Sequence, residues 1–413
     1  MALKAVHVSD VPTLDHVPDN NALYASRFTT PGVELGRGAS LKDHNNKKFL
    51  VIGHRGNGMN MLQSSDLRMK AVKENTILSF NTASQYPIDF IEFDVQVTSD
   101  GCPIIFHDNF IYTEEKVGRT IISGKRVTEL SLSEFLCYGP QREDGREGKA
   151  LWRKMKDGKV VNWAVERDDC ACTLQEAFER VNPALGFNIE LKFDDHLVYT
   201  QDYLTHVLEA VLEIVLKHAK ERPVIFSSFQ PDAALLVRKL QSTYPVYFLT
   251  NGGNEVYEDG RRNSLDEAIK VCLEGGLQGI VSEVRGIFRS PGMVNKIKEA
   301  GISLLTYGKL NNVAEAVYIQ HLMGINGVIV DLVKEISDAV RKMVTDEEEE
   351  EEEEEQVIEI LSSSSSSLEG EGEGEGDDDD DGQPKKKQQQ LQRPQFSQRE
   401  LSFLLKLIPE LLQ

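Results

Sequence analysis

The pattern of apolar and polar positions divides residues 47–345 into short buried segments separated by longer amphipathic ones. In Phe90–Val97 apolar residues alternate with Glu92, Asp94 and Gln96, and this period of two predicts a β-strand with one apolar and one charged face. Runs of four to six mainly apolar residues recur along the chain and predict further strands. The predicted strands are Lys48–Ile52, Phe90–Val97, Ile104–His107, Phe187–Leu191, Val224–Ser228, Val246–Leu249, Gly279–Ser282, Ser303–Tyr307 and Gly327–Asp331.

Amphipathic helices are predicted in the intervals, and strict alternation of strands with helices favours a mainly parallel sheet. They are expected at Glu74 to about Gln85, Thr173–Val181, 201–219, 231–241, 264–274, Met293–Ala300 and Val313–Leu322. Because Asp100-Gly101 predicts a hairpin between two of the nine strands, eight strands remain, which is the number in a (β/α)8 TIM barrel. An open doubly wound sheet is the alternative, but no GxGxxG follows the first strand.

The hairpin sets which residues face each other. A two-residue turn at Asp100-Gly101 places opposite one another residues whose numbers sum to about 201, so that Asp94 faces His107. A slip of one residue would reverse this orientation. The stretch from about 109 to 170 is polar and rich in turn residues, and we expect it to form a long excursion from the barrel rim.

The two ends of the chain differ from this pattern. Residues 1–46 are polar and irregular and predict an N-terminal extension. Residues 346–413 include Glu347–Glu355, Ser362–Ser367 and Asp377–Asp381, a composition that predicts a disordered acidic tail. Within it, Phe396–Leu412 has leucines at helical spacing and predicts a short amphipathic segment.

Composition excludes several classes of function. The tail accounts for 16 of the 21 net negative charges, and the remainder has no basic stripe, which excludes nucleic acid as the expected partner. No run reaches the ~18 apolar residues of a membrane span. Five cysteines form no regular framework, which favours a reducing compartment. The N-terminus lacks a long apolar region, so secretion is not expected, and Asp10, Asp15 and Asp19 argue against a transit peptide.

Three carboxylates predict a metal site. Glu92 and Asp94 lie two apart on one strand and point the same way, while Glu190 ends another strand. Carboxylates that converge at a barrel mouth repel one another unless a cation lies between them, and oxygen ligands suit Mg²⁺ or Ca²⁺. The alternative is a set of surface ion pairs, which the apolar neighbours in FIEFDV and FNIELK disfavour.

Histidines and fixed positive charges surround the same mouth. His54 and His107 end predicted strands, and such a pair can accept and donate a proton. Arg55 and Lys192 add positive charge that would stabilise a phosphoryl group. Together with a metal ion, these residues predict phosphodiester hydrolysis.

The order and spacing of six motifs resemble those of the glycerophosphodiester phosphodiesterase family, most closely its plant soluble or plastid-type branch. The motifs are GHRG (53–56), ENT (74–76), IEFDVQVTSDG (91–101), IIFHD (104–108), NIELK (188–192) and FSSF (226–229). The resemblance implies a phospholipase C-like (β/α)8 barrel. It also implies hydrolysis of glycerophosphocholine, glycerophosphoethanolamine and similar diesters to glycerol 3-phosphate and an alcohol, in head-group turnover and phosphate recycling.

The resemblance also implies roles for individual residues. His54 and His107 would be the acid/base pair, Arg55 and Lys192 would hold the phosphate, and Glu74 and Asn75 would line or buttress the site. Glu92, Asp94 and Glu190 would bind one divalent cation, Mg²⁺ or Ca²⁺. The chain departs from the family pattern at Lys73, where a proline is usual, and in the LLTYGK and VIVDLV stretches near residues 304–333.

Two other functions agree with parts of the sequence. A substrate hydroxyl could attack phosphorus and give a cyclic phosphate, as in phospholipase-like relatives, or the protein could be a non-catalytic scaffold that uses its acidic tail. Small soluble glycerophosphodiesters are the expected partners, without stable membrane insertion, and the oligomeric state is not specified. The resemblance favours the plastid, with the cytoplasm as the alternative.

Overall fold

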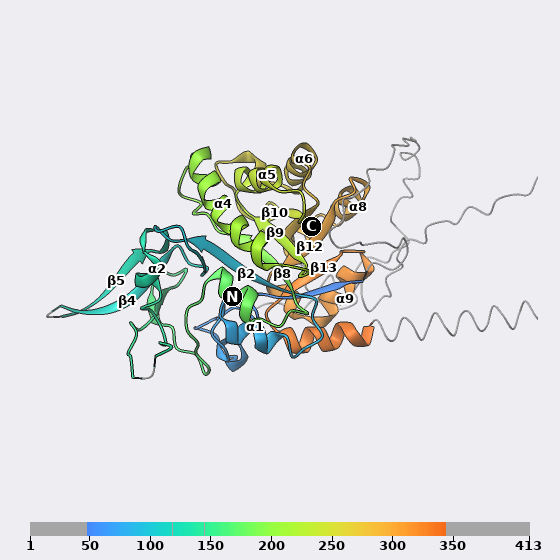
Figure 1. The fold of residues 1–413 in the computed structure, drawn as a ribbon. Coiled ribbons are helices and arrows are strands. Elements are labelled where there is room, and N and C mark those ends of the chain that lie inside the picture. Colours follow the sequence, from blue (N-terminus) through green and yellow to red (C-terminus); the bar gives the residue numbers. More distant parts are fainter. Residues whose placement is uncertain (1–47, 118, 144, 344–413) are drawn as a thin grey trace, which may run out of the picture. The chain divides into compact units, whose positions relative to one another are not determined.

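The computed structural model describes residues 48–343, apart from residues 118 and 144. Within this range eight parallel strands form a closed barrel, because β1 pairs with β13 on one side and with β2 on the other. A further strand, β3 (Pro103–Ile105), lies antiparallel against β2. The barrel strands are β1 (Leu50–Gly53), β2 (Phe90–Val97), β8 (Gly186–Leu191), β9 (Val224–Ser228), β10 (Val246–Thr250), β11 (Gly279–Glu283), β12 (Ser303–Tyr307) and β13 (Gly327–Val330). The predicted (β/α)8 barrel is therefore confirmed (Figure 1).

The helices between the strands form the outer layer (Figure 1). Their ends follow local capping chemistry, as in the reciprocal capping box of Thr173 and Glu176 and the left-handed Gly276 that ends α6. They are η3 (Leu67–Lys70), α1 (Ile77–Ala83), α3 (Leu174–Arg180), α4 (Gln201–His218), α5 (Pro231–Leu240), η5 (Gly260–Arg262), α6 (Leu265–Gly275), α7 (Val284–Arg289), α8 (Gly292–Glu299), η6 (Lys309–Asn312) and α9 (Ala314–Leu322). Residues 333–343 are also helical. No helix among the described residues is long and apolar enough to cross a membrane.

The alternation in β2 separates two environments. Phe93 packs against Phe80 and Phe187 in the layer between strands and helices, with ring centroids 5.2 and 5.0 Å away. Because successive side chains point to opposite faces of a strand, Glu92 and Asp94 point into the barrel instead. The apolar face thus fixes the strand, and the barrel's interior receives the charged face.

Residues 109–170 form an excursion from the barrel, as predicted, and we call this segment the insert. It contains an antiparallel sheet in the order β5-β4-β6-β7 and a small core around Phe135, Tyr138 and Trp163. Its elements are β4 (Phe110–Val117), β5 (Arg119–Arg126), η4 (Val127–Glu129), α2 (Leu132–Phe135), β6 (Trp152–Lys154) and β7 (Val160–Asn162). The polar pattern of the insert did not reveal this sheet.

The predicted hairpin register is wrong by one residue. Val95 pairs with Ile105, so paired numbers sum to 200. The loop has three residues instead of two and ends at Gly101, whose φ of 79° is left-handed. Phe106 is therefore opposite Asp94, with its N–H 3.0 Å from the Asp94 carbonyl. His107 lies beyond the end of β3.

The predicted helix start at Glu74 is also wrong. The Thr76 side chain caps α1 by accepting from the Ser79 N–H, so the helix begins at Ile77. Asn75 has a left-handed φ of 58° that no helix accommodates. Glu74 and Asn75 consequently belong to the loop that precedes α1.

The predicted N-terminal extension and acidic tail lie outside the described residues, as do the domain boundaries at 46/47 and 345/346.

Candidate active site

The loop after β1 places His54 and Arg55 at the C-terminal mouth of the barrel. Arg55 and Asn75 both have left-handed backbones, with φ of 50° and 58°. Their loops are tied together, since the Asn75 N–H donates to the Arg55 carbonyl at 3.1 Å and the Arg55 N–H donates to Glu92 Oε2 at 3.0 Å. Strained backbones of this kind persist where surrounding contacts fix them, and they gather at functional sites.

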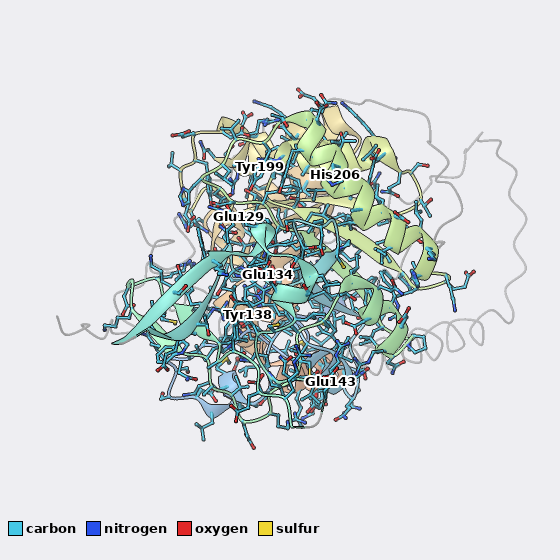
Figure 2. All side chains as sticks on the ribbon, turned by 60° about the vertical axis from the view of Figure 1, so that its left-hand side comes forward. Glu129, Glu134, Tyr138, Glu143, Tyr199 and His206 are labelled. Atoms are coloured by element: carbon cyan, nitrogen blue, oxygen red, sulfur yellow. The ribbon has the colours of Figure 1, made fainter. Side chains whose placement is uncertain are left out.

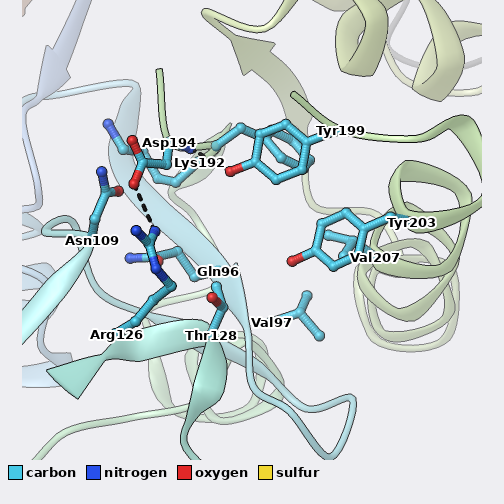
Figure 3. A pocket seen from close by; sticks show the side chains of 11 residues that line it. Gln96, Val97, Asn109, Arg126, Thr128, Lys192, Asp194, Tyr199, Tyr203 and Val207 are labelled. Carbon is cyan, nitrogen blue, oxygen red and sulfur yellow. Dashed lines mark hydrogen bonds and ion pairs between the residues drawn. The ribbon is translucent and has the colours of Figure 1, made fainter. Parts of the chain in front are cut away.

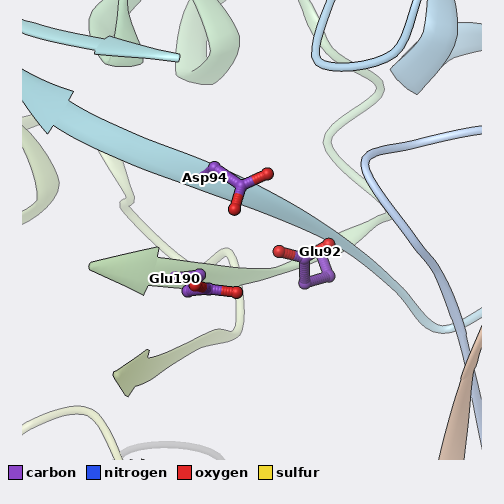
Figure 4. A group of neighbouring side chains, drawn as sticks. All are labelled: Glu92, Asp94 and Glu190. Atoms are coloured by element: carbon purple, nitrogen blue, oxygen red, sulfur yellow. The ribbon is translucent and has the colours of Figure 1, made fainter. Parts of the chain in front are cut away.

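Glu92, Asp94 and Glu190 form the carboxylate cluster (Figure 4). Asp94 of β2 is the register partner of Glu190 on β8, and one oxygen from each of the three groups lies within 4.8 Å of the others. Glu92 Oε1 and Asp94 Oδ1 are buried without a hydrogen-bond partner. Burial and then the Asp94 charge raise the pKa of Glu92, which is the behaviour of anionic groups that lack a counter-charge.

Two cationic side chains contact the carboxylate cluster but leave Glu92 Oε1 and Asp94 Oδ1 without a hydrogen-bond donor. Lys192 Nζ lies 2.8 Å from Glu190 Oε1 and 3.7 Å from Asp94 Oδ1. Arg55 Nε lies 3.3 Å from Asp94 Oδ2, and Asn75 Nδ2 donates to the same oxygen at 2.9 Å. Burial lowers the pKa of Lys192, but Glu190 and Asp94 outweigh burial and raise it above its usual value, so this lysine stays charged.

His54 is held by Asp331, which follows it by 277 positions in the sequence. The parallel pairing of β1 and β13 brings them together, and His54 Nδ1 lies 2.7 Å from Asp331 Oδ1. His54 Nε2 lies 3.9 Å from Glu92 Oε2, toward the carboxylate cluster. Burial lowers the pKa of His54, but the charge and hydrogen bond of Asp331 more than offset this and the net shift is upward.

His107 forms a second carboxylate–histidine pair, in which its Nδ1 lies 2.7 Å from Asp108 Oδ1. Burial, followed by the charges of Arg55 and Lys192, lowers the pKa of His107 well below its ordinary value. The two histidines thus have pKa shifts of opposite sign, an arrangement that separates acid from base in many active sites.

Glu74 is saturated by partners and does not face open space. It accepts from Arg55 at 2.6 Å, from Arg153 at 3.1 Å and from the Asn60 N–H. Burial would raise the pKa of Glu74, but Arg153 and Arg55 lower it to about 2. Glu74 therefore buttresses Arg55.

All nine residues predicted for the site belong to this one network of contacts and charges. The model of the glycerophosphoryl diester phosphodiesterase family matches residues 54–335. The chain belongs to this family.

Two relatives from Arabidopsis thaliana match over full length. Glycerophosphodiester phosphodiesterase GDPD1, chloroplastic, is 58% identical over 414 residues, and GDPD2 is 57% identical over 413 residues, each covering 100% of both chains. A solved structure named as a glycerophosphoryl diester phosphodiesterase, from Silicibacter pomeroyi, has a TM-score of 0.53 at 19% identity and covers 72% of this chain and 95% of its own. That structural match supports the barrel fold.

Sequence reasoning missed three residues of this glycerophosphodiester phosphodiesterase site. Two of them could have been found from the sequence. Asp331 ends the last predicted strand, which pairs with the first strand in a closed barrel, and Asp108 directly follows His107. Arg153 had none, since it lies in the polar insert and reaches Asp108 Oδ1 at 2.9 Å only through the fold.

A small pocket beside Lys192 separates the insert from the segment between β8 and α4 (Figure 3). Arg126 of the insert bridges it by donating to Asp194 Oδ2 at 2.6 Å. The rings of Tyr199 and Tyr203 stack with centroids 5.3 Å apart, and their hydroxyls point toward the pocket. Figure 2 shows the insert residues Glu129, Glu134, Tyr138 and Glu143 together with Tyr199 from that segment and His206 from α4.

The departures from the family pattern fall around the mouth. Lys73 is buried, donates to the Trp163 carbonyl at 2.8 Å and lies over the Trp163 ring, so it fastens the ENT loop to the insert. Tyr307, from the LLTYGK stretch, donates to Asn251 Oδ1 and packs edge-on against Phe229 at 6.0 Å. These contacts support the surroundings of the site, and neither residue replaces one of its ionisable groups.

Proposed function

We propose that the protein hydrolyses small glycerophosphodiesters, such as glycerophosphocholine and glycerophosphoethanolamine, to glycerol 3-phosphate and an alcohol. The observation that carries this proposal is the carboxylate cluster with two unpaired buried oxygens lying beside two carboxylate-held histidines. Family membership and the names of the Arabidopsis relatives support the same reaction.

In this proposal His54 and His107 are the acid/base pair. Each imidazole has its Nδ1 fixed by a carboxylate, so its Nε2 is left to exchange a proton with the reacting diester. One histidine takes a proton from the attacking water and the other gives one to the departing alcohol oxygen. Lys192 and Arg55 would hold the phosphate and stabilise the negative charge that develops on its oxygens.

Glu92, Asp94 and Glu190 would hold one divalent cation, Mg²⁺ or Ca²⁺. The fit is supported by the donor set, which consists of oxygens alone, and by the unpaired oxygens of Glu92 and Asp94. When bound, such an ion would supply Lewis-acid neutralisation of the phosphate. Asn75 keeps Asp94 oriented toward the cluster.

The proposed location is the plastid, supported by the chloroplastic designation of the Arabidopsis relative GDPD1. Soluble diesters are the proposed substrates because the described residues offer no membrane-spanning helix and because the acidic tail would be repelled by anionic lipid. A fluorescent fusion of the full chain that stays in the cytoplasm would overturn the plastid proposal.

Phosphorus NMR of the purified full chain with glycerophosphocholine tests the activity. We expect the glycerol 3-phosphate resonance to appear with Mg²⁺ or Ca²⁺, to be lost with EDTA and to return when the ion is restored. Accumulating cyclic phosphate would favour the phospholipase-like alternative. Full activity in EDTA would rule out the cation, and equal turnover of phosphatidylcholine vesicles would rule out the preference for soluble diesters.

A further inference from the structure

Arg153 reaches into the site from outside the barrel. It lies on β6 of the insert and its side chain is 9% exposed. The guanidinium donates to Glu74 Oε2 at 3.1 Å and to Asp108 Oδ1 at 2.9 Å, and its second nitrogen also lies 3.0 Å from Glu74 Oε1. One side chain of the insert therefore bridges two carboxylates that come from different loops at the barrel mouth.

Each of these carboxylates holds a group with a proposed role in the reaction. Glu74 accepts from Arg55 at 2.6 Å, and Asp108 lies 2.7 Å from His107 Nδ1. Arg153 is thus linked through Glu74 to Arg55, the proposed phosphate-binding group, and through Asp108 to His107, a proposed acid/base group. Arg55 and Arg153 thus share the Glu74 carboxylate, and Arg153 also offsets the charge of Asp108, so neither buried guanidinium lacks a counter-charge.

The packing of the insert fixes where Arg153 lies. Its guanidinium stacks on the Trp163 ring with 4.2 Å to the centroid. The Trp163 indole N–H donates to Asn60 Oδ1 at 3.0 Å, and Lys73 donates to the Trp163 carbonyl. A planar guanidinium stacked in this way can donate hydrogen bonds to both carboxylates at once, whereas the single ammonium group of a lysine cannot.

We propose that Arg153 is a positioning residue through which the docked insert holds Arg55 and His107 in their working geometry. The inference rests on the proposed function, because it concerns how fast that reaction runs. Arg153 acts through Glu74 and Asp108 and does not itself touch the substrate. Its loss removes charge-assisted hydrogen bonds from both carboxylates, so both supported groups move.

The test compares Arg153→Met and Arg153→Lys with Arg142→Met. Arg142 is a matched control, because it also joins the insert to the barrel, donating to Glu176 Oε2 at 2.8 Å, but contacts no residue of the site. Steady-state kcat and KM are measured on glycerophosphocholine and on bis(p-nitrophenyl) phosphate, an activated diester that needs no head-group recognition. Thermal melting checks that each variant is folded.

We expect Arg153→Met to lower kcat about 100-fold, since small misplacements of reacting groups have effects of that size, while KM rises by less. Arg153→Lys should lose about tenfold and Arg142→Met less than twofold. The double variant Arg153→Met/Asp108→Asn should be at most about threefold slower than the slower single variant, because the Arg153 contribution that reaches His107 passes through Asp108 and is already lost in Asp108→Asn.

The inference is overturned if folded Arg153→Met keeps kcat within threefold of the unchanged protein, or if Arg142→Met lowers kcat as much as Arg153→Met does. It is also overturned if the loss of kcat in the double variant equals the product of the two single losses. Should Arg153→Met fail to fold, Arg153→Lys decides in the same way. An unchanged protein that is inactive on glycerophosphocholine refutes the proposed function alone, because bis(p-nitrophenyl) phosphate still measures the effect of Arg153.

Discussion

Asp331 and His54 lie 277 positions apart in the sequence, yet Asp331 Oδ1 lies 2.7 Å from His54 Nδ1. Asp331 is itself held by the Met59 N–H at 3.0 Å and by Asn312 Nδ2 at 2.9 Å. Burial raises the pKa of Asp331, but the charge and hydrogen bond of His54, followed by these two donors, outweigh burial and lower it. The carboxylate is therefore a fixed anion that orients the histidine.

Replacing Asp331 with asparagine should lower kcat on glycerophosphocholine at least tenfold. The amide keeps the shape but loses the charge that orients and stabilises His54 in its protonated form. Asp338→Asn is the control and should keep full activity, because among the described residues the ion pairs of Asp338 are with Lys334 and Arg341 on the surface of the helix over residues 333–343. Equal kcat values for the two variants would contradict the role of Asp331.

His54→Ala and His107→Ala should each lower kcat by about 10²-fold or more, the usual contribution of a general acid or base. Both variants should remain folded by thermal melting, but His54→Ala should melt at a lower temperature because it leaves the buried Asp331 carboxylate without its ionic partner. His206→Ala, at an exposed position of α4, serves as control. Losses below tenfold at both His54 and His107 would end their assignment as an acid/base pair.

Glu92→Gln should weaken Mg²⁺ and Ca²⁺ binding at least tenfold in a calorimetric titration, because it removes one of three anionic ligands. In the cation-free protein the same change should cost no stability, since burial and Asp94 disfavour the ionised Glu92. Glu143→Gln removes an equal charge from an exposed side chain and should leave the titration unchanged. Unaltered cation affinity in Glu92→Gln would show that the ion binds elsewhere.

Gly58→Ala should both destabilise the protein and lower its activity. Gly58 has a φ of 102°, and an added Cβ would overlap the backbone of Asp331, so the Asp331–His54 pair must shift. Gly101→Ala is the matched control, with a φ of 79° and open space around the new Cβ; it should cost roughly 1–2 kcal/mol through backbone strain alone and leave kcat unchanged. Chemical denaturation and kcat measure both effects, and equal behaviour of the two variants would refute the steric argument.

The barrel could be predicted because the pattern of apolar residues in each strand identifies that strand locally. Phe90–Val97 and Ser303–Tyr307 were placed with the observed bounds, since an apolar face that packs on helices leaves a period of two or a short apolar run. The hairpin register was not predictable to one residue, because the turn pattern does not distinguish a two-residue from a three-residue loop. The sheet of the insert was hidden because its small core uses scattered residues such as Phe135 and Trp163.

The site residues on strands could be predicted from the sequence, whereas the contacts made by loops and by the insert could not. Glu92, Asp94 and Glu190 follow from strand alternation and parallel register. The bridge from Arg153 to Asp108 joins residues 45 positions apart through the folding of the insert, and no periodicity encodes such a contact. Because Asn75 has a left-handed backbone, α1 begins at Ile77 and not at the predicted Glu74. The ENT residues therefore lie in a loop before the helix.

The pairing of β1 with β13 also determines when during folding the protein becomes competent. The ribosome releases β1 first and β13 last, so a nascent chain holds His54 long before Asp331 exists. Until β13 docks, the unpaired edge of β1 remains open to association with other chains. The closing strand therefore removes an aggregation hazard in the same event that orients His54.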